Sequence, residues 1–302
     1  MKNQAYLLSI VLSLAILSQA NAELISAVTS ARSLISFDSA TPGTIISSLG
    51  ITGFQDVNEG LNDIDYRPSN GVLYVMGNAP GSIYRLYTMN TATAVLSKVG
   101  ADITGLTGTF KGFDFNPVAD LLRITTDSDQ NFRFNASTGL LAGTDTNLAY
   151  AAGDSGAGVN PNIVGSAYNN NVAGAATTTL FNIDSGRDVL VQQNPPNNGT
   201  LITVGALGVD FQNFTGFDIS GQTGTAYATT TNAALTLTNL YTINLATGTS
   251  TLVGQVGSNL VINDFSVRAV PEPSSLALLS ISALAFVRVG INRRKLARTS
   301  IR

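Results

Sequence analysis

The 302-residue sequence contains no cysteine, no histidine and no tryptophan. Without cysteine the chain cannot form disulfides, so packing alone must hold the fold together. Without histidine it cannot carry Ser-His-Asp or Cys-His catalysis, zinc sites built on imidazole, or the side chain that most often exchanges protons near neutral pH. These absences exclude several common classes of enzyme before any motif is considered.

Lysine and glutamate are scarce, whereas glycine, threonine, asparagine and serine are abundant. This composition favours strands and tight turns over helices. Residues 23–269 contain nine basic and eighteen acidic side chains, which gives a net charge of −9. The phosphates of nucleic acid would repel such a segment, whereas its charge suits cations or simple colloidal solubility. Its length is sufficient for one large domain with its own core.

The N-terminus has the three parts of a secretory signal peptide. Lys2 supplies the positive start, Tyr6–Leu17 is an apolar run, and Ala20-Asn21-Ala22 is a small-x-small cleavage site. We therefore expect residues 1–22 to be removed on export, so that the mature chain begins at Glu23.

The C-terminus combines an extended Pro271-Glu272-Pro273 with an apolar run and a basic end. The run from Leu276 to Ile291 would measure roughly 24 Å as a helix, which is short of the ~20 residues of a stable membrane span, and Arg288 interrupts it. Arg293-Arg294-Lys295 follows as a basic stop. Such a marginal segment suits transient membrane association.

This order of features resembles the PEP-CTERM sorting signal of bacterial envelope proteins, which an exosortase recognises and cleaves. The resemblance implies that residues 270–302 are a sorting segment and that exosortase is a partner during sorting. It also implies an exported protein at the cell surface, in the outer envelope or in the extracellular matrix of a bacterium. The arginine inside the run and the seven residues after the basic cluster depart from the pattern. An ordinary C-terminal membrane anchor is the alternative.

A unit of about fifty residues is repeated along the middle of the chain. Its first motif is an aromatic-rich strand ending in Asn or Asp, residues that favour a turn; the copies are Leu34–Asp38, Leu86–Asn90, Asn131–Asn135, Leu180–Asp184 and Leu240–Asn244. The second motif is a short strand around an acid, at Ile64–Tyr66, Phe113–Phe115, Phe217–Ile219 and Asn263–Phe265, with Ser166–Tyr168 as a copy that lacks the acid. Alternation of apolar and polar residues between Gly, Pro and Asn indicates four short strands in each repeat.

The two ends of the repeat indicate a closed ring. The N-terminal segment has only three predicted strands, and the last copy of the second motif stands alone near the C-terminus. Three strands and one strand complete a four-stranded unit, which is how a β-propeller closes its ring and protects its edges. We therefore predict an all-β fold for residues 23–269, a β-propeller of about five four-stranded blades closed by pairing of the N- and C-terminal strands. Six blades are the alternative if Ile163–Leu207 contains further strands, and a β-helix or sandwich is another.

Several longer motifs resemble a bacterial domain of unknown function, numbered 4394. They are Gly112–Pro117, Leu122–Ile124, Gln130–Asn135, Tyr150–Asp154, Asn160–Asn162 and Gln193–Thr200, and the resemblance extends from Ala27 to Val267. It implies an exported propeller whose members often carry PEP-CTERM tails. It implies no activity and no catalytic residues.

Four aspartates recur with the period of the blades: Asp65, Asp114, Asp218 and Asp264. We expect them on the innermost strand of each blade, with Ala167 at the corresponding place in the fourth. A buried Asp can accept backbone N–H groups and tie neighbouring blades together. Repetition with the blade period favours this structural role, because a functional site usually breaks symmetry. The alternative is a Ca²⁺ ion held by carboxylates around the axis, since Ca²⁺ takes six to eight oxygen ligands.

A second candidate for Ca²⁺ lies in a loop. Asp127, Asp129 and Asn131 form the D-x-D-x-N opening of an EF-hand loop. However, Phe132 stands where glycine is needed, and Thr138 stands where the bidentate glutamate belongs. We interpret this stretch as a polar hairpin turn.

Two further loops are rich in Gly, Pro and Asn, namely Asp154–Asn162 and Asn194–Thr200. We expect the first, and by similarity the second, on the surface at the mouth of the ring, where binding residues tend to lie. Tyr168 and Arg187 could flank such a site, although blade packing would explain Tyr168 equally well.

Two functions of different classes fit these features. The favoured one is a non-catalytic envelope or extracellular-matrix protein that binds exopolysaccharide or envelope proteins through propeller loops and needs no cofactor. The other is a Ca²⁺-dependent extracytoplasmic hydrolase, lactonase or lyase. Propeller lactonases usually place a glutamate among their Ca²⁺ ligands, and Glu59, the only glutamate inside the expected ring, has no evident axial position.

Overall fold

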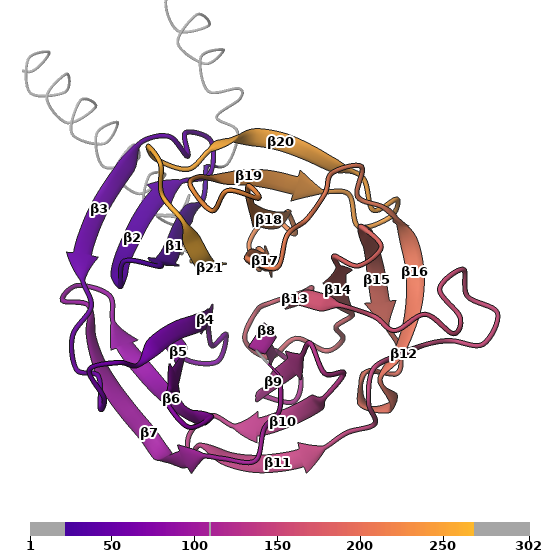
Figure 1. Cartoon of the computed structure of the whole chain (residues 1–302), viewed down its shortest axis with the longest axis horizontal. Helices are drawn as coiled ribbons and strands as arrows, with labels where there is room; N and C mark the ends of the chain where they lie inside the picture. Colours follow the sequence, from indigo (N-terminus) through magenta and orange to yellow (C-terminus); the bar gives the residue numbers. More distant parts are fainter. Residues whose placement is uncertain (1–21, 109, 269–302) are drawn as a thin grey trace, which may run out of the picture. The chain divides into compact units, whose positions relative to one another are not determined.

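The computed structural model describes residues 22–108 and 110–268 (Figure 1). The predicted sorting segment at residues 270–302 and nearly all of the predicted signal peptide therefore lie outside the described residues. Within the described ranges, no helix is long and apolar enough to cross a membrane. The elements of this part of the chain are β-strands, apart from the short 3-10 segment η1 (Pro196–Asn198).

The strands of the described residues form five sheets around a common axis, one for each blade (Figure 1). From the axis outward, blade 1 consists of β21 (Ile262–Val267), β1 (Leu24–Thr29), β2 (Ser33–Asp38) and β3 (Ile45–Gly50). Blade 2 consists of β4 (Gly60–Tyr66), β5 (Leu73–Ala79), β6 (Ile83–Asn90) and β7 (Val95–Ile103). Blade 3 consists of β8 (Phe110–Asn116), β9 (Leu121–Thr126), β10 (Asn131–Asn135) and β11 (Leu140–Thr144).

Blade 4 consists of β13 (Ile163–Tyr168), β14 (Leu180–Asp184), β15 (Val189–Gln193) and β16 (Thr200–Ala206). The short β12 (Ala149–Tyr150) pairs in parallel with β16 and extends the outer edge of this blade. Blade 5 consists of β17 (Thr215–Ile219), β18 (Ala226–Thr231), β19 (Thr238–Ile243) and β20 (Ser250–Gln255).

These sheets confirm the prediction of an all-β propeller with five four-stranded blades, and Ile163–Leu207 supplies one blade rather than two. The ring closes as predicted. Strand β21, from the C-terminal end of the domain, pairs antiparallel with β1, with Ile25 opposite Val267 and Val28 opposite Asp264. The edge of β1 that would otherwise be exposed is thereby paired.

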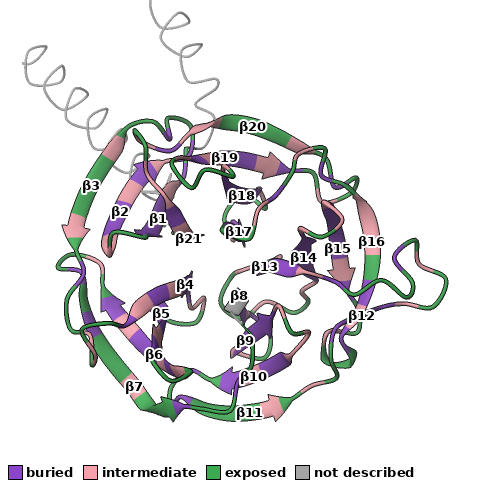
Figure 2. Cartoon of the chain, in the orientation of Figure 1, coloured by how far each residue is buried: buried purple, intermediate pink, exposed green. Residues whose placement is uncertain are grey.

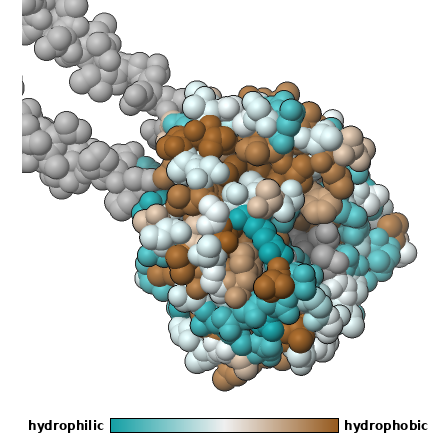
Figure 3. Space-filling view, turned by 60° about the vertical axis from the view of Figure 1, so that its left-hand side comes forward, coloured by the Kyte–Doolittle hydropathy of each residue, from teal (hydrophilic) through white to brown (hydrophobic). Residues whose placement is uncertain are grey.

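Burial decreases from the axis to the rim (Figure 2). All residues of β13 and β17 are buried, because these strands pack between neighbouring blades, whereas at least half of the residues of β3 and of β20 are exposed and none is buried. The outer strands also carry exposed apolar side chains, such as Ile46 and Leu252. Apolar and polar residues therefore lie in mixed patches on the side of the ring that Figure 3 shows.

The hydrophobic core is divided among the spaces between blades. Phe115 of blade 3 packs in one cluster with Met76 of blade 2, and Phe217 of blade 5 packs in another with Leu190 of blade 4. Two further clusters join blade 1 to blade 2 and to blade 5. Blade stability therefore depends on both neighbours, as expected for a ring.

Glycine allows the innermost strands to approach one another closely. A Cβ atom added to Gly165 of β13 would lie 2.7 Å from the Cβ of Phe217 on β17. Gly112 on β8 and Gly216 on β17 occupy equivalent places and are equally crowded. A larger residue at these positions would push neighbouring blades apart.

Candidate functional site

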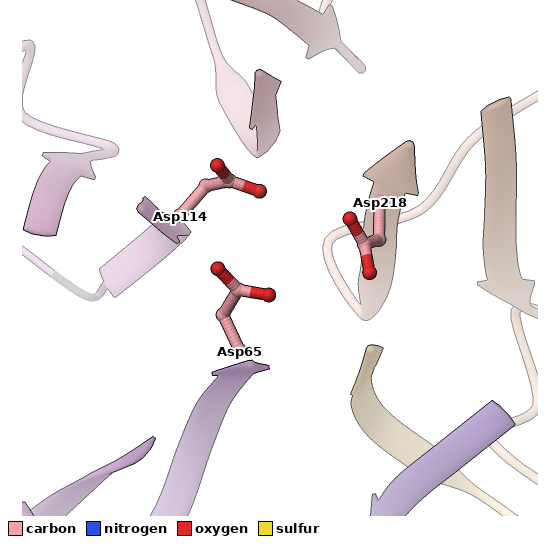
Figure 4. Close-up of side chains that lie close together, drawn as sticks. All are labelled: Asp65, Asp114 and Asp218. Carbon is pink, nitrogen blue, oxygen red and sulfur yellow. The ribbon is translucent and has the colours of Figure 1, made fainter. Parts of the chain in front are cut away.

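Three of the four repeated aspartates meet at the centre of the ring (Figure 4). Asp65 comes from β4, Asp114 from β8 and Asp218 from β17, and one carboxylate oxygen of each lies within 4.8 Å of the others. Their side chains point toward one another (Figure 4), and the residues are 1 %, 0 % and 2 % exposed. The position on the innermost strands agrees with the prediction.

Each of these aspartates ties its own blade to the next one. Asp65 Oδ2 accepts the backbone N–H of Phe115 at 3.0 Å, and Asp114 Oδ1 accepts that of Tyr168 at 3.3 Å. Asp218 Oδ2 accepts the N–H of Val267 at 2.6 Å. In every case the donor is the residue that follows the equivalent position of the neighbouring innermost strand. The expected structural role is therefore present in the hydrogen bonds.

The same pattern corrects the assignment of the fourth aspartate. On β21 the equivalent position is Ser266, not Asp264, because Ser266 Oγ accepts the N–H of Tyr66 at 3.2 Å. Ser266 Oγ also lies 2.8 Å from Asp65 Oδ1 and 3.0 Å from Asp218 Oδ2, and these two carboxylates share its single hydroxyl hydrogen. Asp264 stands two residues earlier on the strand.

Asp264 makes a separate hydrogen bond to blade 2, two residues before Ser266 on β21. Its Oδ2 accepts the N–H of Ile64 on β4 at 2.8 Å. Burial raises its pKa well above the usual range, and the carboxylate of Asp63 raises it further. Asp264 is thus a buried blade tie that lies outside the group of three.

Blade 4 is the exception, as the sequence predicted from Ala167. The methyl group of Ala167 cannot accept a hydrogen bond. The N–H of Ile219, which would be its partner in blade 5, is instead accepted by Asp218 Oδ1 at 2.6 Å. Asp114 Oδ1 accepts the N–H of Tyr168 in blade 4, whereas its Oδ2 is buried and has no hydrogen-bond partner among the described residues.

The site is strongly unfavourable for negative charge. Burial raises the pKa of Asp114 well above its usual range, and the carboxylates of Asp65 and Asp218 raise it further. The pKa of Asp65 is also raised well above its usual range, chiefly by burial and then by the carboxylate of Asp218. Burial also raises the pKa of Asp218 to about 6, although the hydrogen bonds it accepts favour its charged form. These carboxyl groups therefore need protons or a cation among them.

Basic side chains do not supply that compensation in the described part of the chain. Their ion pairs go to Glu59, Asp102, Asp120 and Asp145 instead. Each of these acids lies outside the axial group.

The glutamates have other roles. Glu59 is fully buried in blade 2, where it accepts hydrogen bonds from the Tyr87 hydroxyl at 2.9 Å and from Arg85 at 3.0 Å. Glu23 accepts hydrogen bonds from Ser220 and Thr223 of blade 5. Neither belongs to the axial group, so the described residues place no glutamate where the lactonase alternative would need one as a metal ligand.

The structure does not bring the EF-hand-like residues together as a site. Asp127 and Asp129 lie in the turn between β9 and β10, as expected for a hairpin, and Asn131 begins β10. The Asn131 side chain is buried, its oxygen accepts a hydrogen bond from Arg123, and its amide donates to the carbonyl of Thr146 at 3.2 Å. Asn131 is therefore committed to the fold.

Sequence reasoning missed the polar network around Arg123. This side chain is 1 % exposed between blades 3 and 4, and it donates to Tyr168 Oη at 2.7 Å and to Asn197 Oδ1 at 2.7 Å. It also pairs with Asp145 at 3.0 Å. The loop Asn194–Thr200, expected at the mouth of the ring, thus holds this interface together. The sequence feature that could have indicated this network is the arginine placed between two apolar residues, Leu122 and Ile124.

The other loop expected at the mouth of the ring, Asp154–Asn162, is also anchored to the fold. Asp154 accepts the N–H of Thr203 on β16 at 2.7 Å. Arg187 lies over the ring of Tyr150 at 4.9 Å, whereas Tyr168 is buried against Arg123. The two residues that could flank a loop site therefore have separate partners. The predicted sorting motif, Pro271, Glu272 and Pro273, lies outside the described residues.

The fold and the site together define a five-bladed β-propeller with buried carboxylates at its axis. The model of a family described as a domain of unknown function, DUF4394, matches residues 33–266. The chain belongs to this family, as the motifs between Ala27 and Val267 predicted. No curated protein matches it.

Proposed function

We propose that this protein is a non-catalytic component of a bacterial envelope or extracellular matrix that binds exopolysaccharide or another envelope protein through its propeller loops. The observation that carries the proposal is that the three axial aspartates are buried and hydrogen-bonded to neighbouring blades. Asp65, Asp114 and Asp218 are at most 2 % exposed, and each holds a backbone N–H of the next blade. A substrate cannot reach carboxylates that are closed in and used in this way. The absence of histidine supports the same reading.

Binding and turnover are measured together. The purified protein is mixed with exopolysaccharide from its host, and we record both sedimentation with the polymer and release of new reducing ends. We expect binding without release. Release of soluble products at a rate proportional to protein concentration would contradict the non-catalytic role.

The proposal includes export and sorting, and it rests here on the sequence patterns at the two ends. In a host that contains an exosortase, the mature protein should begin at Glu23 and end between Val270 and Ser275. Intact-mass measurement tests both ends at once. A mature species that retains Arg293-Arg294-Lys295 would refute sorting and favour a plain membrane anchor.

A Ca²⁺-dependent hydrolase, lactonase or lyase is the second candidate. It is favoured by the three carboxylates within 4.8 Å and by the unpartnered Asp114 Oδ2. This candidate requires turnover that disappears in Asp114→Asn and in chelator. Polysaccharide binding that survives both treatments, without turnover in any sample, would eliminate it.

A further inference from the structure

One carboxylate oxygen of Asp114 has no hydrogen-bond partner in the part of the chain that the structure describes. Its Oδ1 accepts the N–H of Tyr168, but Oδ2 is buried without a hydrogen bond. Leaving a charged acceptor unsatisfied inside a protein costs more than a typical hydrogen bond contributes. The oxygen belongs to the carboxylate that points toward Asp65 and Asp218 (Figure 4).

Tying the blades does not require this much acid. Ser266 occupies the equivalent position on β21 and accepts the N–H of Tyr66 with an uncharged hydroxyl. Three carboxylates are therefore more negative charge than the hydrogen bonds between blades require. A role that uses the charge itself explains the excess.

The oxygens have a suitable arrangement for a hard cation. Ca²⁺ binds oxygen ligands at about 2.3–2.6 Å, so oxygens on opposite sides of one ion lie up to about 5 Å apart. The three carboxylate oxygens lie within 4.8 Å of one another, and the Ser266 hydroxyl contacts two of the carboxylates. Carboxylate and hydroxyl oxygens favour Ca²⁺ or Mg²⁺ over zinc or copper.

We propose that the axis of this propeller binds one Ca²⁺ ion through Asp65, Asp114 and Asp218, with the Ser266 hydroxyl beside it. Asp114 Oδ2 is the ligand that makes no hydrogen bond among the described residues, and Asp65 and Asp218 each bring one carboxylate oxygen within 4.8 Å of the others. Water completes the coordination, since blade 4 contributes only Ala167. The ion links blades 1, 2, 3 and 5 through their innermost strands. This role is structural and stands independently of any polysaccharide bound by the loops.

The experiment uses the purified full chain, stripped of metal with a chelator and titrated with Ca²⁺ alone. Calorimetry should give about one Ca²⁺ per chain. At a hundredfold excess over the dissociation constant, the melting temperature should rise by about 5–11 °C, because a ligand that binds only the native state stabilises it by mass action. No shift at millimolar Ca²⁺ would overturn the proposal.

Asp114→Asn is the principal variant. Its amide oxygen can keep the tie to Tyr168, but the charge and the free carboxylate oxygen are lost. The Ca²⁺ dissociation constant should rise at least about tenfold, as a change of one charged ligand implies. The matched control is Asp264→Asn, which changes a buried tie outside the group of three and should alter Ca²⁺ affinity far less than Asp114→Asn does. Equal loss in both variants would overturn the assignment to these ligands.

Two further results settle the remaining outcomes. If Asp114→Asn does not fold, equilibrium dialysis of the wild-type chain decides: about one Ca²⁺ per chain supports the site, and none refutes it. Mg²⁺ demands near-ideal octahedral geometry, so it should shift the melting temperature less than Ca²⁺ does. A larger shift with Mg²⁺ would overturn the choice of calcium.

Discussion

Replacement of Phe265 by alanine tests whether the closing strand holds the ring. Phe265 lies on β21, the strand that joins the C-terminal end of the domain to β1. The chain has no disulfide to reinforce this junction. The ring is therefore held closed by the β21–β1 ladder and by the side chains that β21 buries.

The magnitude follows from the packing of this ring. Phe265 is 1 % exposed and packs with Ile25 and Phe37 of blade 1 and with Tyr227 and Leu240 of blade 5. A buried Phe→Ala change costs about 3–5 kcal/mol, because it removes apolar contact and leaves a cavity. For a domain of this size, that loss lowers the melting temperature by about 6–20 °C.

Thermal unfolding followed by circular dichroism measures the effect. The control is Leu252→Ala on the outer strand β20, where the side chain is 58 % exposed and the change should lie within about 0.5 kcal/mol. Deletion of Asn263–Arg268 is the extreme case, and it should give aggregated protein because the edge of β1 loses its partner and the ring opens. The reasoning would be refuted if Phe265→Ala had the same melting temperature as the Leu252→Ala control, or if the deletion variant were soluble and folded.

Three other measurements address separate parts of the molecule. Gly165→Ala places a Cβ 2.7 Å from Phe217 and should lower the free energy of unfolding by about 1–3 kcal/mol. Urea unfolding should then show a lower midpoint at unchanged slope. An unchanged midpoint would contradict the close approach of β13 and β17. Arg123→Met leaves its polar partners buried and should reduce the free energy of unfolding by about 3–5 kcal/mol; a loss below about 1 kcal/mol would mean that blades 3 and 4 do not depend on it. Hydrogen bonds from Arg85 are the largest cause that lowers the pKa of Asp102 to about 2, so its stabilisation is complete above about pH 4 and is lost as the pH falls toward 2. An NMR titration should show this pKa rising in Arg85→Ala, and an unchanged value would contradict the assigned cause.

The fold could be predicted because its signals are local and repeated. Alternation of apolar and polar residues marks each strand, and Asn, Asp and Gly mark each turn. The decisive signal was the incomplete first repeat, since three strands before Gly50 need the lone strand around Asp264 to complete a blade. The number of blades then followed from counting copies of one motif.

The interface of blades 3 and 4 could not be predicted in the same way. Arg123 reaches Asn197, which is 74 positions away, and Tyr168, which is 45 positions away. A buried guanidinium is stable only when several partners converge on it, and their convergence is a property of the folded ring. The sequence displayed the arginine and the Asn-rich loop as separate motifs, with nothing to connect them.

The error at Asp264 has a different cause, which lies in strand geometry. Side chains on a strand alternate between two faces, so a shift of two residues keeps the same face and leaves the burial pattern unchanged. The acid followed by an aromatic residue at Asp264-Phe265 matched Asp114-Phe115, yet hydrogen bonding aligns Ser266 with Asp114. The five equivalent positions are therefore three aspartates, one alanine and one serine. This asymmetry matters because the sequence argument for a purely structural role assumed that the acids follow the symmetry of the ring, and on the innermost strands they do not.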